Sequence, residues 1–445
     1  MIGARLPVVA VSGIPNVGKS TLFNRVLGQR KAIVDDTPGV TRDRHFARAD
    51  WAGRDFFLVD TGGVVEGSDR PLDRAVRAQA LAAVEEADLI LFVVDARDGI
   101  HPLDEKLATL LRLSERPVLL VANKVDNIPR ETSHHEFWAL GVGEPVPVSA
   151  ISGKGSGDLL DVVLEALPDP EAVPAEPDTV RVAVIGKPNV GKSSFVNRLF
   201  GQERMVVSET AGTTRDPVDS TMRYHGRDLV FVDTAGLRRQ ARIHDSIEYY
   251  AWLRATRVIR EADVCLVLTD ASSGIHMQDV KVAEAAWDSG CGVILVVNKW
   301  DLVERNGSTA PGIEKAVRAR TPFLRWVPFV FTSALTGQRV RRTLDLVLRV
   351  QSERERRIPT AELNRELGRL VARHPPAHSR GRAVKVRYGT QVGVAPPAFV
   401  LFSNLPREIQ PAYVRYLENG FRNRWPMAGS PLRMRFKADG GSDRR

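Results

Sequence analysis

The strongest constraint on the fold of this chain is that its sequence repeats itself at a long and nearly fixed interval. The run GIPNVGKST, which begins at Gly13, returns as GKPNVGKSS from Gly186, a spacing of 173 residues. Two later motifs, TRD and DTxG, return at the same spacing, and the interval grows to 175 for NKxD and to 184 for a Ser-Ala pair. Because insertions are absorbed mainly in surface loops, this regular repeat indicates two copies of one domain.

The 445 residues divide into these two copies, a short third domain and the segments that join them. Residues 168–179 are rich in proline and acidic side chains and have no apolar periodicity, which is typical of an extended linker. The polar stretch from Gln351 is expected to continue a helix of the second copy into the third domain. The predicted division is a first copy at 1–167, the linker at 168–179, a second copy at 180–352, a third domain at 353–437 and a disordered tail at 438–445.

Short runs of Val, Leu and Ile alternate with helical stretches inside each copy. In the first copy these runs are VVAVS from Val8, FFLVD from Phe56, LILFVVD from Leu89 and VLLVANK from Val118. Continuous apolar runs of this length suit the strands of a parallel sheet that is covered on both faces. The predicted fold class is therefore α/β, with two tandem doubly wound, mostly parallel sheets.

Each copy opens with a glycine-rich loop between an expected strand and an expected helix, the context in which GxxxxGK[ST] binds phosphate. The glycines allow backbone N–H groups to surround a phosphate, the lysine reaches the β- and γ-phosphates, and the serine hydroxyl ligates Mg²⁺. Two matches in register with four other motifs exclude a chance pair of glycine turns. The predicted binding residues are Gly13, Asn16, Gly18, Lys19, Ser20 and Thr21 in the first copy, and Gly186, Asn189, Gly191, Lys192, Ser193 and Ser194 in the second.

A DxxG motif follows the loop in each copy, from Asp60 to Gly63 and from Asp233 to Gly236. It ends an expected strand, so its carboxylate is predicted to lie near a metal ion, while its glycine can offer an N–H group to the γ-phosphate. A single DxxG has little weight as a signal. Its fixed spacing after the glycine-rich loop is what supports the interpretation.

The NKxD motif is predicted to recognise the base. Its aspartates, Asp126 and Asp301, can accept hydrogen bonds from N1–H and from the N2 amine of guanine, an edge that adenine does not present. A buried carboxylate without these partners is costly, so discrimination against ATP could reach ~10⁴-fold. The Ser-Ala pairs would close over the guanine oxygen through backbone N–H groups. The predicted base-binding residues are Asn123, Lys124, Asp126, Ser149 and Ala150 in the first copy, and Asn298, Lys299, Asp301, Ser333 and Ala334 in the second.

Together these motifs resemble those of the translation-factor-like GTPases. Two such domains followed by a short basic domain resemble the EngA/Der family over essentially the whole chain. The resemblance implies two P-loop G domains that bind GTP and GDP and hydrolyse GTP, followed by a small α+β KH-like domain. It also implies a nucleotide-switched factor that binds rRNA and acts in assembly of the large ribosomal subunit.

The resemblance also assigns roles to individual residues. Thr41 and Thr214 match the switch threonine that contacts Mg²⁺ and the γ-phosphate, with Thr213 as the other candidate in the second copy. The implied catalytic residues are Lys19, Thr41, Asp60 and Gly63 in the first copy, and Lys192, Thr214, Asp233 and Gly236 in the second. The implied Mg²⁺ ligands are Ser20, Thr41 and Asp60, and Ser193, Thr214 and Asp233.

Neither copy has a glutamine after DxxG, where many related GTPases use one to orient water. Val64 and Leu237 occupy the position, and neither side chain can hold a water molecule. GTPases with a hydrophobic residue there and an asparagine in the P-loop use K⁺ as an added cation at the phosphates. The resemblance therefore implies K⁺ at Asn16 and Asn189; the alternative is that both are turn or capping asparagines.

The formal net charge of +9 belongs to the C-terminal part of the chain. From Gln351 to Arg445 there are 19 Lys and Arg and 8 Asp and Glu, a net of +11. The first 350 residues hold the other 44 basic and 46 acidic residues, a net of −2. A basic surface of this kind attracts phosphate through counterion release, and its alternative is a solvated arginine-rich face without a partner.

The third domain is predicted to run helix, strand, strand, helix, strand, at residues 361–374, 382–392, 398–404, 408–425 and 432–437. This order resembles the KH-like domain of the family, but the GxxG loop that clamps single strands in KH domains does not occur in it. Sequence-specific reading of bases is therefore not expected. Arg382, Lys385 and Arg387 are the predicted RNA contacts, on the interpretation that they alternate along one strand.

Composition sets the remaining expectations. No apolar run is long enough to span a bilayer and the start lacks a signal peptide, which favours a cytoplasmic protein. We also expect a monomer. Cys265 and Cys291 lie in or beside apolar runs and are expected to be buried thiols. Two alternatives remain: one copy has become a nucleotide sensor that barely hydrolyses, or the chain acts in tRNA modification or membrane signalling. The second is disfavoured because no lipidation signal or additional catalytic motif occurs.

Overall fold

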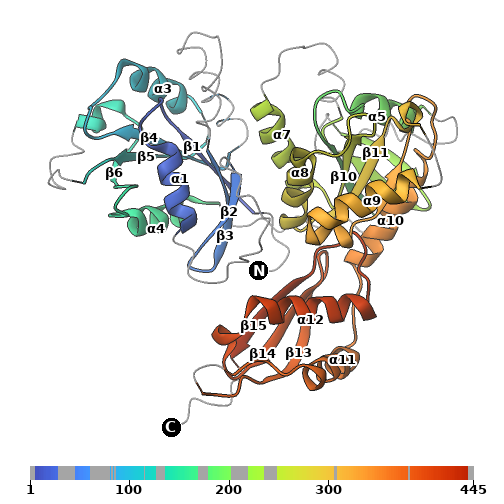
Figure 1. Ribbon diagram of the computed structural model, residues 1–445. Coiled ribbons are helices and arrows are strands. Elements are labelled where there is room, and N and C mark those ends of the chain that lie inside the picture. Colours follow the sequence, from blue (N-terminus) through green and yellow to red (C-terminus); the bar gives the residue numbers. More distant parts are fainter. Residues whose placement is uncertain are drawn as a thin grey trace. The chain divides into compact units, whose positions relative to one another are not determined.

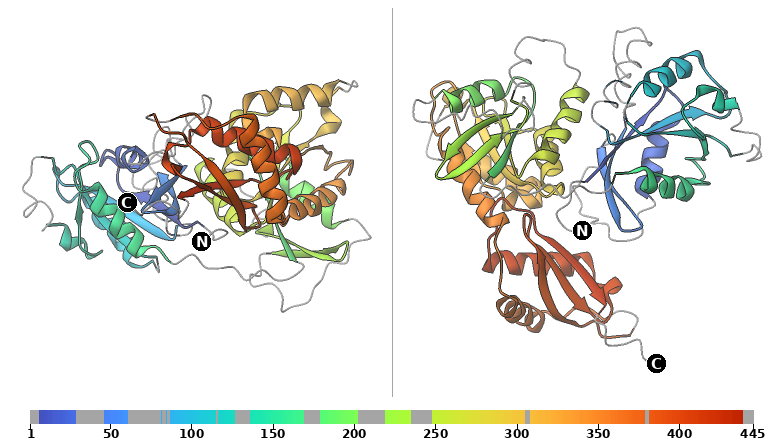
Figure 2. Two further views of the ribbon diagram at one scale, coloured as in Figure 1. Left: turned by 90° about the horizontal axis from the view of Figure 1, so that it is seen from below. Right: turned by 180° about the vertical axis from the view of Figure 1, so that it is seen from behind.

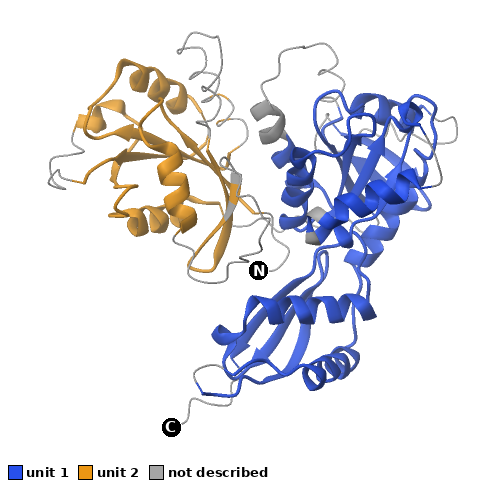
Figure 3. Cartoon of the chain, in the orientation of Figure 1, with its two compact units in different colours: residues 1–4, 172–245, 255–445 blue, residues 5–171, 246–254 orange. Residues whose placement is uncertain are grey.

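The computed structural model describes residues 6–28, 46–60, 81, 84, 87–114, 116–126, 136–168, 179–201, 219–234, 248–304, 308–378 and 381–438. The chain divides into two compact units (Figure 3), one of residues 5–171 and 246–254 and the other of residues 1–4, 172–245 and 255–445. The predicted domain boundaries remain a prediction. Within the described ranges, no helix has both the length and the apolar character needed to cross a bilayer.

The first copy is built on a six-stranded sheet in the order β2-β3-β1-β4-β5-β6 (Figure 1). All neighbouring strands are parallel except β2 and β3, an antiparallel pair at one edge. Strands β1 and β4 are buried along their whole length, as expected for the centre of a covered sheet. The elements are β1 (Val8–Ser12), α1 (Lys19–Gly28), β2 (Phe46–Trp51), β3 (Arg54–Asp60), β4 (Leu89–Asp95), α3 (Pro102–Arg112), β5 (Val118–Asn123), η2 (Glu136–Leu140), β6 (Val146–Pro147) and α4 (Ser156–Ala166).

The second copy repeats this sheet with the equivalent order, β8-β9-β7-β10-β11-β12, and with helices on both faces (Figure 2). Helices α5 and α10 share one hydrophobic core with alternate residues of β7 and β10, and α8 packs against β10 and β11. The predicted fold class is confirmed. The elements are β7 (Thr179–Ile185), α5 (Lys192–Phe200), β8 (Ser220–Tyr224), β9 (Arg227–Phe231), α7 (Glu248–Glu261), β10 (Val264–Asp270), α8 (Met277–Asp288), β11 (Gly292–Asn298), η4 (Trp300–Leu302), α9 (Thr309–Arg320), η5 (Pro322–Arg325), β12 (Phe329–Phe331) and α10 (Arg342–Arg354).

The third domain is a three-stranded sheet in the order β13-β14-β15 with two helices on one face. Strands β13 and β14 are antiparallel, whereas β14 and β15 are parallel. The core joins one face of the sheet to α11 and α12 through Leu363, Phe399, Leu401 and Phe421. The elements are α11 (Thr360–Arg373), β13 (Val386–Gly393), β14 (Ala398–Ser403), η6 (Pro406–Glu408), α12 (Pro411–Arg424) and β15 (Arg433–Ala438).

Two expectations for this region are wrong. Helix α10 ends at Arg354 and α11 begins at Thr360, so no continuous helix joins the second copy to the third domain. In a continued helix the Arg354 carbonyl oxygen would accept from the Ile358 N–H. It accepts instead from the Ala395 N–H at 2.8 Å, and the Ile358 N–H donates to Gln391 Oε1 at 2.7 Å. Pro359 also disfavours helical backbone at Ile358, the residue before it.

The second error concerns the predicted RNA contacts. Strand β13 begins at Val386, so Arg387 lies in it but Arg382 and Lys385 do not, and the three do not alternate along one strand. The side chain of Asn404 provides the physical reason. It accepts a hydrogen bond from the Lys385 N–H (2.7 Å) and donates one to the Ala383 carbonyl oxygen (2.9 Å), which replaces a strand ladder at this position.

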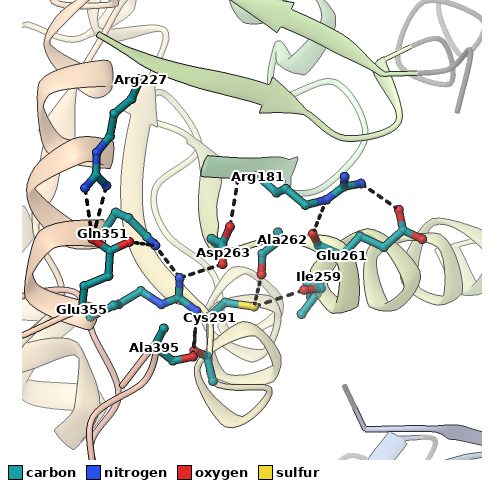
Figure 4. Close-up of polar contacts among 12 residues, drawn as sticks. Arg181, Arg227, Ile259, Glu261, Ala262, Asp263, Cys291, Gln351, Glu355 and Ala395 are labelled. Atoms are coloured by element: carbon teal, nitrogen blue, oxygen red, sulfur yellow. Dashed lines mark hydrogen bonds and ion pairs between the residues drawn. The ribbon is translucent and has the colours of Figure 1, made fainter. Parts of the chain in front are cut away.

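The third domain is held against the second copy at the end of the sheet where β10 and β11 begin. We call this contact between the second copy and the third domain the seam; Asp263, Gln351 and Ala395 are labelled there in Figure 4. Arg354, only 4% exposed, bonds to all three. Its guanidinium donates to Asp263 Oδ1 at 3.1 Å and to Gln351 Oε1 at 2.6 Å, and its carbonyl oxygen accepts from the Ala395 N–H at 2.8 Å. The Gly429 carbonyl oxygen accepts from the Val293 N–H of β11 at 2.7 Å. Backbone hydrogen bonds from both sides therefore close the seam.

A second arginine packs across the same seam. Arg422 is buried, and its guanidinium lies over the rings of Trp287 (5.4 Å) and Trp326 (5.1 Å) of the second copy. It also donates to Glu418 Oε1 at 3.0 Å within α12. A buried guanidinium is favourable only when it is paired and hydrogen-bonded, and stacking on indole rings adds a cation–π contribution. Arg433 adds a hydrogen bond to the Asp288 carbonyl oxygen at 2.9 Å.

Both cysteines are buried, which confirms the expectation for them. The Cys291 thiol donates to the Ile259 carbonyl oxygen, with an Sγ to O distance of 3.1 Å. Burial raises the pKa of the Cys265 thiol well above its usual value, so it stays protonated at neutral pH. Both buried thiols are therefore structural residues of the second copy.

Candidate functional site

The glycine-rich loops can follow their observed paths only with glycine. Gly13 has a φ of 150°, and a Cβ atom there would lie 2.3 Å from a carbonyl oxygen of β4. Gly18 has a φ of 93°, and its Cβ would lie 2.4 Å from Nδ2 of Asn123. The equivalent positions of the second copy, Gly186 and Gly191, are restricted in the same way. The backbone therefore passes close to the ends of the central strands before α1 and α5 begin.

The loop asparagines have a backbone role in both copies. Asn16 has a φ of 68° and Asn189 a φ of 64°, which is the left-handed region that asparagine tolerates better than most residues. This conformation accounts for a turn asparagine at each position. A role as K⁺ ligands remains a prediction.

The loop lysines point back into their own loops. Lys19 is 6% exposed and donates from Nζ to the Ile14 carbonyl oxygen at 2.7 Å. Lys192 donates to the carbonyl oxygens of Gly186 at 2.9 Å and Lys187 at 2.6 Å. Burial lowers the pKa of each lysine to about 8, an effect that Asp60 opposes at Lys19. A buried ammonium group held only by carbonyl oxygens would gain strongly from an anionic partner such as a phosphate.

Nucleotide binding should therefore be linked to proton uptake. A folded-state pKa of about 8 instead of 10.5 means that the nucleotide-free folded chain binds fewer protons than the unfolded chain between these values, so stability increases with pH across this window. Phosphates beside the ammonium groups would return the pKa upward. At pH 8.5, we expect binding of a GTP analogue to take up about 0.5–1 proton per site. Calorimetry in two buffers with different ionisation enthalpies measures this uptake.

Two controls show whether the protons are taken up by the lysines or by the nucleotide. The γ-phosphate, with a second pKa near 6, is already deprotonated at pH 8.5 and does not contribute. Lys19→Met and Lys192→Met should each remove the uptake at one site. A binding enthalpy that is independent of the buffer would contradict the prediction.

The predicted Mg²⁺ ligands Ser20 and Asp60 lie together in the first copy. Ser20 Oγ donates to Asp60 Oδ2 at 2.6 Å, and Asp60, the last residue of β3, is fully buried. A hydroxyl and a carboxylate are the oxygen ligands that Mg²⁺ prefers, and one or two carboxylates plus phosphate oxygens suffice for it. No group of three or more His, Cys, Asp or Glu side chains that could hold a metal occurs in the described part of the chain.

The corresponding position of the second copy differs. Asp233 follows the end of β9 with a φ of 56°, and its N–H donates to Asp219 Oδ1 at 2.9 Å. The left-handed backbone at Asp233 contrasts with the strand conformation of Asp60. Several other predicted residues, with the positions after DxxG, lie outside the described ranges: Thr41, Gly63, Val64, Thr213, Thr214, Gly236 and Leu237.

Asn123 joins three of the predicted motifs of the first copy. Its Nδ2 donates to the Val17 carbonyl oxygen of the glycine-rich loop at 2.8 Å, and its Oδ1 accepts from the Ala150 N–H at 3.0 Å. Asn298 does the same in the second copy, with Val190 at 2.9 Å and Ala334 at 3.0 Å. The phosphate-side loop, NKxD and the Ser-Ala pair therefore form one connected structure in each copy.

The carboxylate of Asp126 is oriented by two neighbours. Ser149 Oγ donates to Oδ1, and the Arg97 guanidinium donates to Oδ2 at 2.8 Å. The hydroxyl of Ser149, and then the charge of Arg97, lower the pKa of Asp126, which keeps it ionised as a hydrogen-bond acceptor. The lysine of the motif is held as well, since Lys124 Nζ forms an ion pair with Asp95 Oδ2 at the end of β4.

Sequence comparisons agree with this geometry. The family described as "50S ribosome-binding GTPase" matches residues 8–124 and 181–299, and the family described as "KH-domain-like of EngA bacterial GTPase enzymes, C-terminal" matches residues 357–437. The chain is 56% identical to GTPase Der of Gemmatimonas aurantiaca over 96% of its length and 98% of that protein. It is 50% identical to GTPase Der of Moorella thermoacetica (97% and 98%) and 47% identical to that of Caldanaerobacter subterraneus (96% and 97%).

The chain belongs to the Der family of GTPases. It is a GTP-binding and GTP-hydrolysing protein with two tandem G domains, the first and second copies, and its third domain is KH-like. The family membership confirms the resemblance that the motifs and their order indicated.

Some residues of the Der site were missed by the sequence analysis. Asp95 pairs with Lys124, and its counterpart Asp270 pairs with Lys299 at 2.6 Å. The repeat does mark these aspartates in the sequence. Asp95-Ala96 returns as Asp270-Ala271 at a spacing of 175 residues, the same spacing that separates the two NKxD motifs. Arg97 has no such signal, since serine takes its place in the second copy.

A further ion pair is specific to one copy of the Der chain. Lys187 of the second glycine-rich loop lies 3.2 Å from Asp279 Oδ2 in the first turn of α8. Ile14 occupies the equivalent position of the first loop, where the carboxylate that corresponds to Asp279 is Asp104. Desolvation raises the pKa of Asp104. The second copy therefore connects its phosphate-side loop to α8 through a charged contact that the first copy does not form.

Proposed function

We propose that this Der GTPase is a nucleotide-switched factor in assembly and stability of the large ribosomal subunit. The observation that carries the proposal is that both G-domain segments match a family described as 50S ribosome-binding GTPases, in a chain whose C-terminal part has a net charge of +11. The nucleotide state of the G domains would set affinity for the particle, and hydrolysis would time release. A polyanionic partner suits the basic third domain, which attracts phosphate in a salt-dependent way.

Within each G domain, we assign the phosphates to the glycine-rich loop with Lys19 or Lys192, and guanine to Asp126 or Asp301. Mg²⁺ would be held by Ser20, Asp60 and Thr41 in the first copy and by Ser193, Asp233 and Thr214 in the second. Gly63 and Gly236 would offer N–H groups to the γ-phosphate. Positioning and charge stabilisation would do the catalytic work, as is general for phosphoryl transfer. The remaining contacts are assigned to Gly13, Asn16, Gly18, Thr21, Asn123, Lys124, Ser149 and Ala150, and to Gly186, Asn189, Gly191, Ser194, Asn298, Lys299, Ser333 and Ala334.

We further propose that K⁺ stimulates hydrolysis and that Asn16 and Asn189 help to hold it. Support comes from the apolar residues Val64 and Leu237 at the position after DxxG, which leaves the site without a glutamine to orient water. A bound K⁺ would add positive charge at the phosphates. GTP turnover measured in KCl and in NaCl at equal ionic strength tests whether K⁺ stimulates hydrolysis. Equal rates in the two salts would contradict the proposal.

We propose that the protein acts as a monomer in the cytoplasm and contacts rRNA through its third domain. Arg387 remains a candidate contact on β13 and is exposed. Arg382 and Lys385 are also exposed and lie just before this strand. These two residues therefore do not share one face of a strand with Arg387, and we no longer propose that they contact RNA from such a face.

Cosedimentation with ribosomal subunits tests the proposed function. Purified protein is centrifuged with separated subunits at physiological salt, with GDP or with a non-hydrolysable GTP analogue. We expect the protein to pellet with the large subunit in the GTP-like state and to remain largely in the supernatant with GDP. The small subunit is the matched control. Absence from the pellet in every state, with nucleotide binding intact, would show that the partner is wrong.

A second candidate function is that one copy senses nucleotide and barely hydrolyses it. The contrast between Asp60, in a strand and bonded to Ser20, and Asp233, in left-handed backbone, favours this idea for the second copy. Against it, both copies retain the lysine, serine, DxxG and NKxD of the site. Turnover of Lys19→Ala and of Lys192→Ala, measured separately, distinguishes the two candidates.

A further inference from the structure

The third domain has one sheet face that its own core does not use. Helices α11 and α12 pack on the other face, against Phe399, Leu401, Met434 and Phe436 (Figure 1). Side chains alternate across a sheet, so the neighbours of these residues in β14 and β15 point away from the helices. We call the surface that they form with β13 the open face. Its exposed and half-buried members are Tyr388, Thr390, Val392, Phe402, Arg435 and Lys437, whereas Ala398 and Val400 on the central strand are buried.

An aromatic pair lies on the open face. The rings of Tyr388 and Phe402 are stacked, with centroids 4.4 Å apart and an angle of 12° between their planes. The two residues are direct partners in the β13–β14 ladder, so the backbone itself places the rings together. Tyr388 is 46% exposed and Val392 is 45% exposed, among the few large apolar side chains exposed in the described ranges. The open face therefore presents the exposed ring of Tyr388, backed by the half-buried ring of Phe402.

Basic side chains border the aromatic pair. Lys437 is the register partner of Phe402, and Arg435 is the register partner of Val400 on the next row. Both are exposed, and they alternate on β15, which puts them on the same face about 6.7 Å apart. The row Tyr388, Phe402, Lys437 therefore runs from an exposed ring to a cation across the three strands.

This combination fits single-stranded RNA better than a duplex. Stacking on an exposed ring needs a base that is not already stacked in a helix, and every base has a face that can stack. Arg435 and Lys437 are spaced along β15, the edge strand opposite β13. Cations in such a row can follow the phosphates of an extended RNA chain. The absence of a GxxG loop from the third domain removes the usual KH clamp but leaves this face intact.

We infer that the open face of the third domain is a binding platform for single-stranded RNA, on which one base stacks against Tyr388 while Lys437 and Arg435 contact phosphates. The inference rests on the proposed function, which supplies RNA as the partner, and it assigns the contact to a face rather than to a loop. We expect binding to tolerate any base, because every base has a face that can stack.

Fluorescence anisotropy of the full chain with a labelled single-stranded RNA of about 12 nucleotides tests the inference. Loss of one base–aromatic stack in Tyr388→Ala should weaken binding roughly 5–150-fold, whereas Tyr388→Phe keeps the ring and should stay within about 2-fold of the parent. Trp138→Ala is the matched control, since Trp138 is 51% exposed but lies in the first copy; its binding should not change. Lys437→Ala should reduce the slope of log K against log salt by about 0.7, and Tyr388→Ala should leave that slope unchanged.

The results of this experiment can contradict the RNA platform without contradicting the proposed ribosomal function, and the reverse. Binding by Tyr388→Ala that equals the parent, or no binding of the RNA by the parent, would overturn the platform. Equal losses in Tyr388→Ala and Tyr388→Phe would do so too, because they would indicate a hydroxyl contact instead of stacking. Cosedimentation with the large subunit in any of these cases would leave the proposed function standing. Stacking on Tyr388 without cosedimentation would instead retain the platform and remove the ribosomal role. Thermal unfolding and GTP turnover of each variant, expected to match the parent, verify folding.

Discussion

Replacing Asp126 or Asp301 with asparagine should weaken GTP binding to the altered domain by up to ~10⁴-fold. The carboxylate can accept from both N1–H and the N2 amine of guanine, whereas an asparagine amide presents an N–H group to at least one of these donors. In the first copy the carboxylate is held by Ser149, so it cannot easily turn away from the mismatch. The unaltered domain should bind as before.

Xanthine nucleotides provide the sharpest measurement of this effect. Xanthine carries a carbonyl oxygen where guanine has its amine, and the asparagine amide can donate to it. Calorimetric titration should find two GTP sites in the parent chain, and one GTP site plus one xanthosine triphosphate site in Asp126→Asn or Asp301→Asn. Ser149→Ala removes a single neutral hydrogen bond and should cost only about 2–10-fold. Two GTP sites of unchanged affinity in either asparagine variant would contradict the assigned role of these residues.

Removing both loop lysines should reduce GTP turnover by about 10²–10³-fold. Each lysine is the cation of its loop, buried at Lys19 and half-buried at Lys192, and the carbonyl oxygens around it cannot supply positive charge to a phosphate. The Lys19→Ala, Lys192→Ala double variant should show the full loss in phosphate release at saturating GTP. Unchanged turnover in the double variant would exclude these lysines from the reaction.

The single variants determine how the two copies share the work. If both copies hydrolyse equally, Lys19→Ala and Lys192→Ala should each retain about half of the parent rate, because the other copy is intact. If one copy is a sensor, one single variant should retain nearly all activity and the other almost none. Equal residual activities would eliminate the silent copy.

The architecture was predictable because the repeat and the apolar runs are local signals. The centres of both sheets consist of buried strands whose sequences are unbroken apolar runs, mostly Val, Leu and Ile. Strand β2 has no such run, since FARADW mixes polar and apolar residues at the sheet edge, and it was not predicted. The Asn404 side chain that replaces a strand ladder near Lys385 lies 19 residues away, and no local pattern announces it.

In the candidate site, too, local motifs could be predicted from the sequence, whereas tertiary contacts could not. The motifs identified which residues to consider, but not which of them touch. The Asn123 amide donates to the Val17 carbonyl oxygen, 106 residues earlier in the sequence, and so connects two motifs. The pairing of Arg97 with Asp126 is also a tertiary contact, and no repeat marks it because the second copy has Ser272 there.

The seam fixes the order of the two copies along the chain. In α8, the last turn presents Trp287 and Asp288 to the arginines of the third domain. At the 175-residue spacing, the end of α3 instead has Arg112 and Leu113, and Leu113 is 81% exposed.

A chain with its two copies exchanged would therefore set Arg112 against Arg422, cation against cation, in the place of an indole ring. Duplication produced two similar G domains, but divergence at the far ends of their helices made their positions in the chain non-interchangeable. A recombinant of the two halves that kept the nucleotide motifs intact would therefore lose the indole ring of Trp287 that Arg422 packs against.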